Sequence, residues 1–215
     1  IATALLRYAT IGGKARKSLG VLEIDERSSK LIYPYINPTY VVCTNLFRDS
    51  IQRNAHPEYI ADIITSAIGK DTKMILNADD PISSRLAPEN DRVYFSIDRL
   101  PTDNDDCYNI INDCRICPKC STKLNYVFNR YHHIGKVYCP ECDYKSCEPD
   151  YKANVDIAGG TMTVSVNGKD EPFELVSNSV FNIYNQVTAT AVLTEIGLTP
   201  DMIRKGFLKL SIVET

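Results

Sequence analysis

Short apolar runs alternate with polar and helical stretches along the first hundred residues. Four runs rich in aliphatic and β-branched residues are predicted to be strands, at residues 21–24, 40–43, 73–76 and 93–97. Residues 57–68 instead repeat apolar side chains at helical spacing and end at Gly69, which predicts a helix. Short, nearly continuous apolar strands separated by helices are typical of a parallel sheet covered on both faces. The pattern therefore predicts an α/β fold.

The pattern changes in the second half of the chain. Residues 153–176 predict antiparallel strands, because Gly-Gly and Asn-Gly turn signals fall at 158–160 and 167–169. Two helices are predicted to follow, at residues 181–196 and 200–210. A polar, acidic stretch before residue 107 marks a boundary. We therefore predict one domain in two parts, residues 1–106 and 150–215, interrupted by a cysteine-rich module at 107–149.

Two Cys-Pro-x-Cys pairs in this module are its clearest chemical signal. They consist of Cys117, Cys120, Cys139 and Cys142, with residues 121–138 between the pairs. Each Cys-x-x-Cys turn brings two thiolates within reach of one ion, and four sulfur ligands in a tetrahedron are typical of structural Zn²⁺. Because four cysteines close the coordination sphere, we predict a structural zinc ribbon with four cysteine ligands and not a catalytic metal.

Other residues of the module leave alternatives open. Cys114 stands three positions before Cys117, so it has the spacing of a substitute ligand. His132 and His133 lie between the two pairs, where packing or surface exposure is favoured over metal ligation. The clustering of cysteines, together with the lack of a secretory signal in this sequence, favours metal binding in a reducing cytoplasm over a disulfide framework.

Charge and hydropathy exclude some classes of function. Lys and Arg number 24 against 27 Asp and Glu, which gives a formal net charge of −3. This balance disfavours nucleic acid as the main partner, because phosphate binding usually needs clustered basic residues. No apolar run approaches the roughly 20 residues needed to span a bilayer, so no transmembrane segment is predicted.

Polar residues follow several of the predicted strands. Glu23 lies inside the first apolar run, where a carboxylate is costly unless it forms a salt bridge or binds a metal such as Mg²⁺. Asn45 follows the second strand, and Asn77 and Asp80 follow the third. Each alone is compatible with a turn or a helix cap. Together they predict a polar rim at the edge of the sheet where open α/β folds bind ligands.

Four of these segments occur in the same order in the central domain of Mur ligases. They are residues 21–26 (VLEIDE), 43–49 (CTNLFRD), 77–81 (NADDP) and 181–185 (FNIYN). The sequence resembles this family over essentially its whole length, in the form that carries an inserted zinc ribbon. The resemblance implies a P-loop NTPase-like, mostly parallel sheet.

The resemblance also implies an activity. It is the ATP-dependent amidation of the D-glutamate α-carboxyl in the lipid II stem peptide to D-isoglutamine. The ammonia would come from a glutamine amidotransferase (GatD-type) subunit in a heterodimer, at the inner face of the membrane in a bacterial cytoplasm. By motif match, Glu23 would hold Mg²⁺, Asp49 and Asn45 would line the site beside it, and Asn182 and Asn185 would reach the adenine of ATP. Two further residues are carried over as cofactor-binding candidates, Asn77 and Asp80.

One departure from the family concerns the phosphate loop. A Mur ligase needs a glycine-rich phosphate loop, and residues 12–14 (GGK) lack both the preceding strand and a following Ser or Thr. We therefore expect this loop before Ile1 and a further domain after Thr215. The segment alone should then not catalyse the reaction. The alternative is a zinc-ribbon module that binds nucleic acid or protein, or a scaffold domain without activity.

Overall fold

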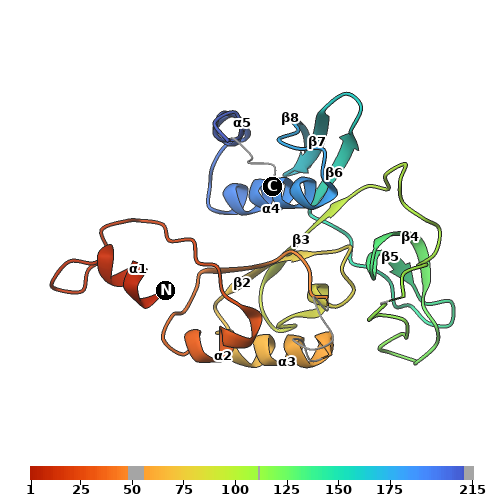
Figure 1. Ribbon diagram of the computed structural model, residues 1–215, viewed down its shortest axis with the longest axis horizontal. Coiled ribbons are helices and arrows are strands. Elements are labelled where there is room, and N and C mark those ends of the chain that lie inside the picture. The colour runs from red at the N-terminus through yellow and green to blue at the C-terminus, as the bar shows by residue number, and fades with distance from the viewer. Residues whose placement is uncertain (48–55, 111, 211–215) are drawn as a thin grey trace.

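The computed structural model describes residues 1–47, 56–110 and 112–210. Its main feature is a six-stranded sheet with the order β1-β2-β3-β6-β7-β8 (Figure 1). The strands of this sheet are β1 (Tyr40–Cys43), β2 (Lys73–Asn77), β3 (Arg92–Ile97), β6 (Tyr151–Asp156), β7 (Thr161–Val166) and β8 (Lys169–Glu174). The first four pair in parallel and the last two are antiparallel. The fold is therefore α/β with a mostly parallel sheet, as the hydrophobic pattern predicts.

The parallel register brings the carboxyl ends of neighbouring strands to one edge. Cys43 pairs with Leu76, and Asn77 pairs with Phe95, so the segments that follow β1, β2 and β3 emerge together. At the other end of the sheet, β7 and β8 are joined by the predicted Asn-Gly turn. Asn167 and Gly168 both have positive φ, at 52° and 75°, as a two-residue turn of the primed type requires.

The two faces of the sheet are buried by different helices, which lie on opposite sides of β2 and β3 in Figure 1. Ile60 and Ile64 of α3 pack in one apolar core with Met74, and Ile183 and Val187 of α4 belong to the other core. The predicted helices are confirmed. The helical elements are α1 (Ala2–Arg7), η1 (Glu26–Ser28), α2 (Ser29–Ile32), α3 (Pro57–Ala67), η2 (Ser83–Arg85), α4 (Val180–Glu195) and α5 (Pro200–Phe207). No helix in the described ranges is long and apolar enough to cross a membrane.

The strand predicted at residues 21–24 is wrong. This segment has no regular structure, and Val21 and Glu23 are exposed. The side chain of Asp25 accepts a hydrogen bond from the amide of Arg27 and so caps η1, which ends the extended stretch before it can pair. The premise that Glu23 is a carboxylate embedded in a strand is therefore wrong as well.

The cysteine module, residues 107–149, contains a separate antiparallel hairpin of β4 (Asn125–Tyr131) and β5 (Ile134–Tyr138). It lies in sequence between β3 and β6, which are neighbours in the main sheet. In Figure 1 the hairpin stands beside the main sheet, in green. Its Leu124 and Val137 share a core with α3, whereas Ile134 joins the core under α4. The module thus packs against both layers; the boundaries at 106 and 149 stay a prediction.

Candidate functional site

The sulfur atoms of Cys117, Cys120, Cys139 and Cys142 converge at the end of the module away from the hairpin turn. All four lie within 4.8 Å of one another. The Sγ atoms of Cys117 and Cys142 are 3.6 Å apart, and those of Cys120 and Cys139 are 3.4 Å apart. Zn–S bonds of about 2.3 Å in a tetrahedron place sulfur atoms about 3.8 Å apart. The four cysteines named from the sequence therefore form a group whose spacing suits one zinc ion.

Cys114, the substitute ligand that spacing allows, is not part of this group. Its side chain lies in the core shared with α3 and is 5% exposed. Burial raises the pKa of the Cys114 thiol to about 12, as expected for a thiol packed among apolar side chains. The structure therefore gives Cys114 a packing role.

Asn77 joins the ends of β1 and β2. Its side chain is fully buried; Nδ2 donates a hydrogen bond to the Thr44 carbonyl at 2.8 Å, and Oδ1 accepts one from the Asp79 amide at 2.9 Å. Both ends of the amide group are therefore used to shape the edge of the sheet. We interpret Asn77, a cofactor-binding candidate from the sequence, as a residue that positions the segment after β1.

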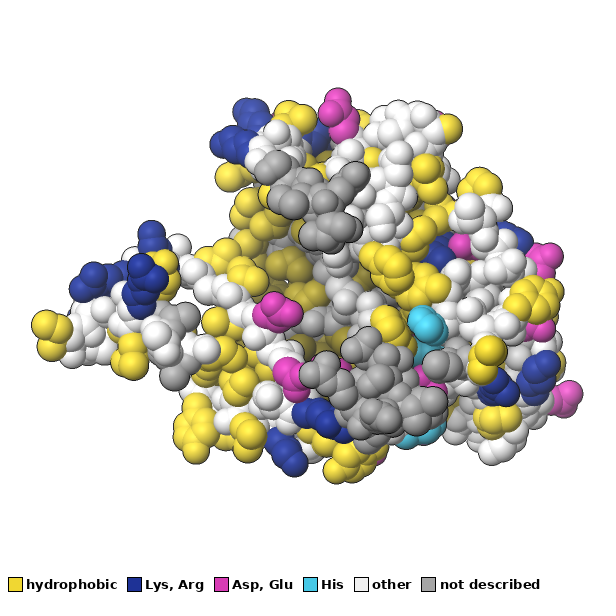
Figure 2. All heavy atoms as spheres, viewed as in Figure 1, with side chains coloured by type: hydrophobic (Ala, Val, Ile, Leu, Met, Phe, Trp, Pro, Cys, Tyr) yellow, Lys and Arg dark blue, Asp and Glu magenta, His cyan; other side chains and the backbone are white. Residues whose placement is uncertain are grey.

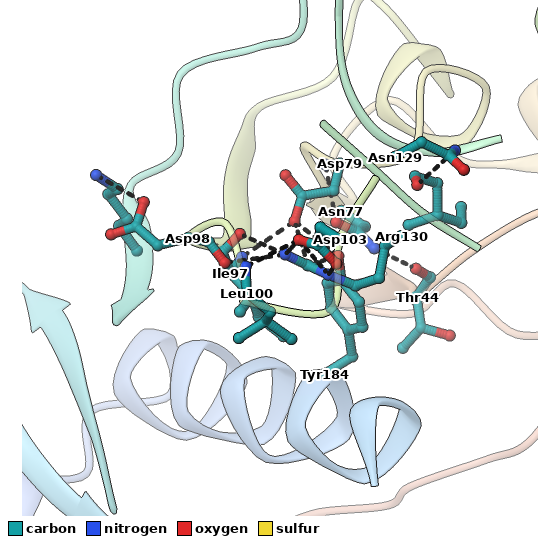
Figure 3. Close-up of polar contacts among 12 residues, drawn as sticks. Thr44, Asn77, Asp79, Ile97, Asp98, Leu100, Asp103, Asn129, Arg130 and Tyr184 are labelled. Atoms are coloured by element: carbon teal, nitrogen blue, oxygen red, sulfur yellow. Dashed lines mark hydrogen bonds and ion pairs between the residues drawn. The ribbon is translucent and has the colours of Figure 1, made fainter. Parts of the chain in front are cut away.

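Asp79 and Arg130 form a buried ion pair between β2 and the module (Figure 3). Oδ2 of Asp79 accepts hydrogen bonds from the Tyr184 hydroxyl at 2.7 Å and from the Ile97 amide at 3.0 Å. The Arg130 side chain is 2% exposed, and its second carboxylate partner is Asp103 at 2.8 Å. Burial raises the pKa of Asp79, and Arg130 only partly opposes this effect. Arg130 is therefore shared by two acidic side chains, and its partners all come from the protein itself.

Asp80 connects the module to the segment after β1. Its carboxylate accepts hydrogen bonds from the Leu46 amide at 2.7 Å, from the Ile82 amide at 2.8 Å and from Nε2 of His133 at 3.1 Å. Burial alone would raise the pKa of Asp80, but the bonds from His133 and the two amides lower it. Because the carboxylate is 0% exposed and engaged by protein donors, we now interpret Asp80 as a residue that shapes the site. His133 is fully buried, which is one of the two outcomes, packing or exposure, that the sequence favoured over metal ligation.

A cavity of about 320 Å³ opens beside the end of β1. Asn45 lines it, together with Glu26, Ser29 and Thr44. Asn45 is only partly buried and donates a hydrogen bond to the Thr44 hydroxyl at 3.4 Å. Figure 2 shows acidic and histidine side chains on one face, toward the junction of the sheet with the module. Unlike Asp79 and Asp80, the polar groups around this cavity have room for a ligand.

The remaining candidates occupy different places. Glu23 is exposed on the irregular segment before η1, close in sequence to Glu26 of the cavity. Asn182 donates a hydrogen bond to the Ser177 hydroxyl at 3.2 Å at the start of α4, and Asn185 is exposed one turn further along. Asp49 lies outside the described residues. Two features were not predicted from the sequence. One is the buried cluster in which Arg130 and Tyr184 bind Asp79 and Arg130 also binds Asp103, here called the clamp. The other is the hydrogen bond between His133 and Asp80.

Comparison with solved structures identifies the class of fold. The chain is similar to a pseudomurein peptide ligase type C from Methanothermus fervidus, with a TM-score of 0.67, 27% identity, and coverage of 82% of this chain and 35% of that chain. It is also similar in fold to MurF from Acinetobacter baumannii, with a TM-score of 0.50, 11% identity, and coverage of 86% of this chain and 31% of that chain. No protein-family model matches. The chain therefore has a Mur ligase-like fold.

Curated relatives narrow this class. The chain is 31% identical over 194 residues to the MurT subunit of lipid II isoglutaminyl synthase (glutamine-hydrolyzing) from Staphylococcus aureus, covering 89% of this chain and 43% of the relative. It is 30% identical over 213 residues to the same subunit from Streptococcus pneumoniae, covering 97% of this chain and 46% of the relative. The chain is thus a MurT-like relative of the Mur ligases, and it spans about half the length of the curated relatives it matches.

Proposed function

We propose that the chain is the central part of an ATP-dependent carbon–nitrogen ligase subunit. Its reaction is the amidation of the D-glutamate α-carboxyl in the lipid II stem peptide to D-isoglutamine. The ammonia comes from a glutamine amidotransferase (GatD-type) subunit in a heterodimer, at the inner face of the cytoplasmic membrane. The observation that carries this proposal is the 31% identity to MurT over 89% of the chain. A polar rim at the carboxyl edge of the sheet supports it.

The open part of this rim is where we propose that ATP and Mg²⁺ bind. ATP supplies the phosphoryl group that activates a carboxylate, and Mg²⁺ neutralises its phosphate charges. Glu23, with an exposed carboxylate, is proposed to hold Mg²⁺, with Asn45 and Asp49 beside it. Asn182 and Asn185, three positions apart at the start of α4, are proposed to bind adenine. The cavity next to Asn45 would orient the carboxylate to be activated.

For the cysteine group we propose one structural Zn²⁺. Four thiolates suit this ion, and the sulfur–sulfur distances of 3.6 and 3.4 Å suit a tetrahedron. The module has few buried apolar residues of its own, so metal binding would supply much of its folding free energy. Elemental analysis of the purified full-length protein should give one zinc per chain.

The activity is tested with the full-length protein and its glutaminase partner. Lipid II, ATP, Mg²⁺ and glutamine are supplied, and mass spectrometry follows replacement of one carboxyl by an amide. We expect product only when ATP is present, and ammonium salts should replace glutamine when the partner is omitted. Glutamine hydrolysis without any amidated product would contradict the proposal and favour a scaffold. Nucleotide-dependent thermal stabilisation of the full-length protein separates these outcomes further.

A further inference from the structure

The cysteine module is joined to the segment after β1 by a buried chain of hydrogen bonds. Nε2 of His133, at the turn of the β4–β5 hairpin, lies 3.1 Å from Oδ1 of Asp80. Oδ2 of the same carboxylate accepts the Leu46 amide at 2.7 Å. His133 and Asp80 are both 0% exposed, and Leu46 is 7% exposed. Water therefore does not substitute for either hydrogen bond, and the carboxylate transmits the position of the hairpin to Leu46.

A second contact runs parallel to this chain. The ring of His132, the residue before His133, stacks on Phe47 with centroids 4.9 Å apart and planes 19° apart. His132 has a φ of 46°, which is uncommon for a residue with a side chain and holds the two histidines in a tight turn. The hairpin turn is thus linked to the two residues that directly follow Asn45: to Phe47 by direct stacking, and to Leu46 through the Asp80 carboxylate.

The hairpin turn is in turn tied to the cysteine group. Strand β5 ends at Tyr138, and the next residue is Cys139 of the group. Near the other end of β5, the Gly135 amide donates a hydrogen bond to the Asp79 carbonyl at 2.7 Å, which fixes the strand against the end of β2. A rigid strand therefore spans from the cysteine group to the sheet edge.

We propose that His133 and Asp80 are positioning residues of the ligase site, through which the metal-binding module sets the place of residues 44–47. This inference rests on the proposed function for its effect on amidation, but the structural coupling holds without it. Loss of the His133 donor leaves a buried carboxylate short of one partner, which weakens its hold on the Leu46 amide. Asn45 then moves relative to the cavity. Even a small displacement of a group that positions the substrate slows the chemical step strongly.

The test uses the full-length protein with its glutaminase partner. His133→Phe removes the donor, and His133→Gln restores a donor at similar reach. Glu148→Gln is the matched control, because it removes an exposed ion pair of 3.7 Å to Lys136 of the same hairpin. Three quantities are measured: amide hydrogen exchange of a peptide covering residues 43–47, zinc content, and the separate values of kcat and KM for ATP.

We expect His133→Phe to keep its zinc, to exchange the 43–47 amides at least tenfold faster, and to lower kcat about tenfold with a smaller change in KM. His133→Gln should recover most of both effects, and Glu148→Gln should match wild type. Removal of zinc by a chelator should also speed exchange in 43–47. If His133→Phe does not fold, His133→Asn replaces it, since its shorter amide cannot reach Asp80.

Unchanged exchange in residues 43–47, in a variant that folds and has lost the donor, overturns the coupling. Faster exchange with wild-type kcat overturns the positioning role alone. Faster exchange in a preparation whose wild type makes no amide would leave the coupling standing and would reject the proposed function instead.

Discussion

The two halves of the sheet edge use the same residue types in opposite ways. Under the cysteine module, Asp79 and Asp80 are buried, and their carboxylates are engaged by Arg130, Tyr184, His133 and backbone amides. Beside β1, Glu26 and Asn45 line an open cavity. A polar residue at a strand end is therefore not by itself a ligand-binding residue. What distinguishes the two halves is whether protein donors already occupy the oxygen atoms.

The largest effect on the buried half is expected from loss of a cysteine of the metal-binding group. Cys120→Ser should lower zinc content well below one per chain and loosen the module, because structural zinc in small domains contributes on the order of 10 kcal/mol. Elemental analysis and limited proteolysis of residues 107–149 measure this. Cys114→Ser is the control, because that thiol lies outside the group. Unchanged zinc content in Cys120→Ser would show that another ligand takes its place.

The next largest effect is expected from loss of the buried ion pairs that Arg130 forms with Asp79 and Asp103. Arg130→Met leaves Asp79 and Asp103 without their cation, so the free energy of unfolding should fall by about 3–5 kcal/mol. Urea denaturation measures the change. The matched control is Arg99→Met, which removes an exposed pair with Asp105 and should cost less than about 1 kcal/mol. Equal losses in the two variants would contradict a special role for burial.

The open half is tested at Glu26, which lines the cavity, and at Glu23, which lies three residues before it. Glu23→Ala should abolish amidation and leave the melting temperature unchanged, because the exposed side chain takes no part in the core. Glu26→Gln, three residues later at the cavity, should lower kcat less. Both are assayed over a range of Mg²⁺ concentrations. If Glu26→Gln were instead the inactive variant, the metal role would move from Glu23 to Glu26.

The smallest effect is expected at the start of α4. Asn185→Ala should raise KM for ATP about tenfold with little change in kcat, which corresponds to the loss of about one hydrogen bond. Asn182→Ala should act similarly and should also loosen the contact with Ser177. The control is Gln186→Ala, whose side chain binds the backbone at Val176 and Glu174 and should change stability more than KM. No change in KM for either asparagine variant would remove the adenine role.

The parallel sheet, the two helices that cover it and the four cysteines could be predicted from the sequence. Each depends on local signals, namely apolar periodicity and the spacing of the Cys-x-x-Cys turns. The segment at residues 21–24 was predicted wrongly, because an apolar run does not reveal whether a neighbouring strand is present to pair with it. The cap made by Asp25 was the competing local signal.

The clamp could not be predicted, because its residues are far apart in sequence and look ordinary where they stand. Tyr184 and Asp79 are separated by 105 positions, and Arg130 and Asp79 by 51. An arginine in a strand usually points to solvent. Arg130 and His133 are polar residues in a short hairpin, which is compatible with full exposure, so the sequence carried no local signal that they would be buried.

The place of the cysteine module between β3 and β6 has a consequence for the order of folding. These strands pair at Phe95 and Tyr151, so the chain from 96 to 150 must close into a loop before the sheet is complete. Closing a loop of flexible chain costs entropy that grows with its length. A module that has already gathered its four thiolates shortens the flexible part of this loop. We therefore expect metal binding to speed assembly of the sheet modestly, even though none of the four cysteines belongs to it.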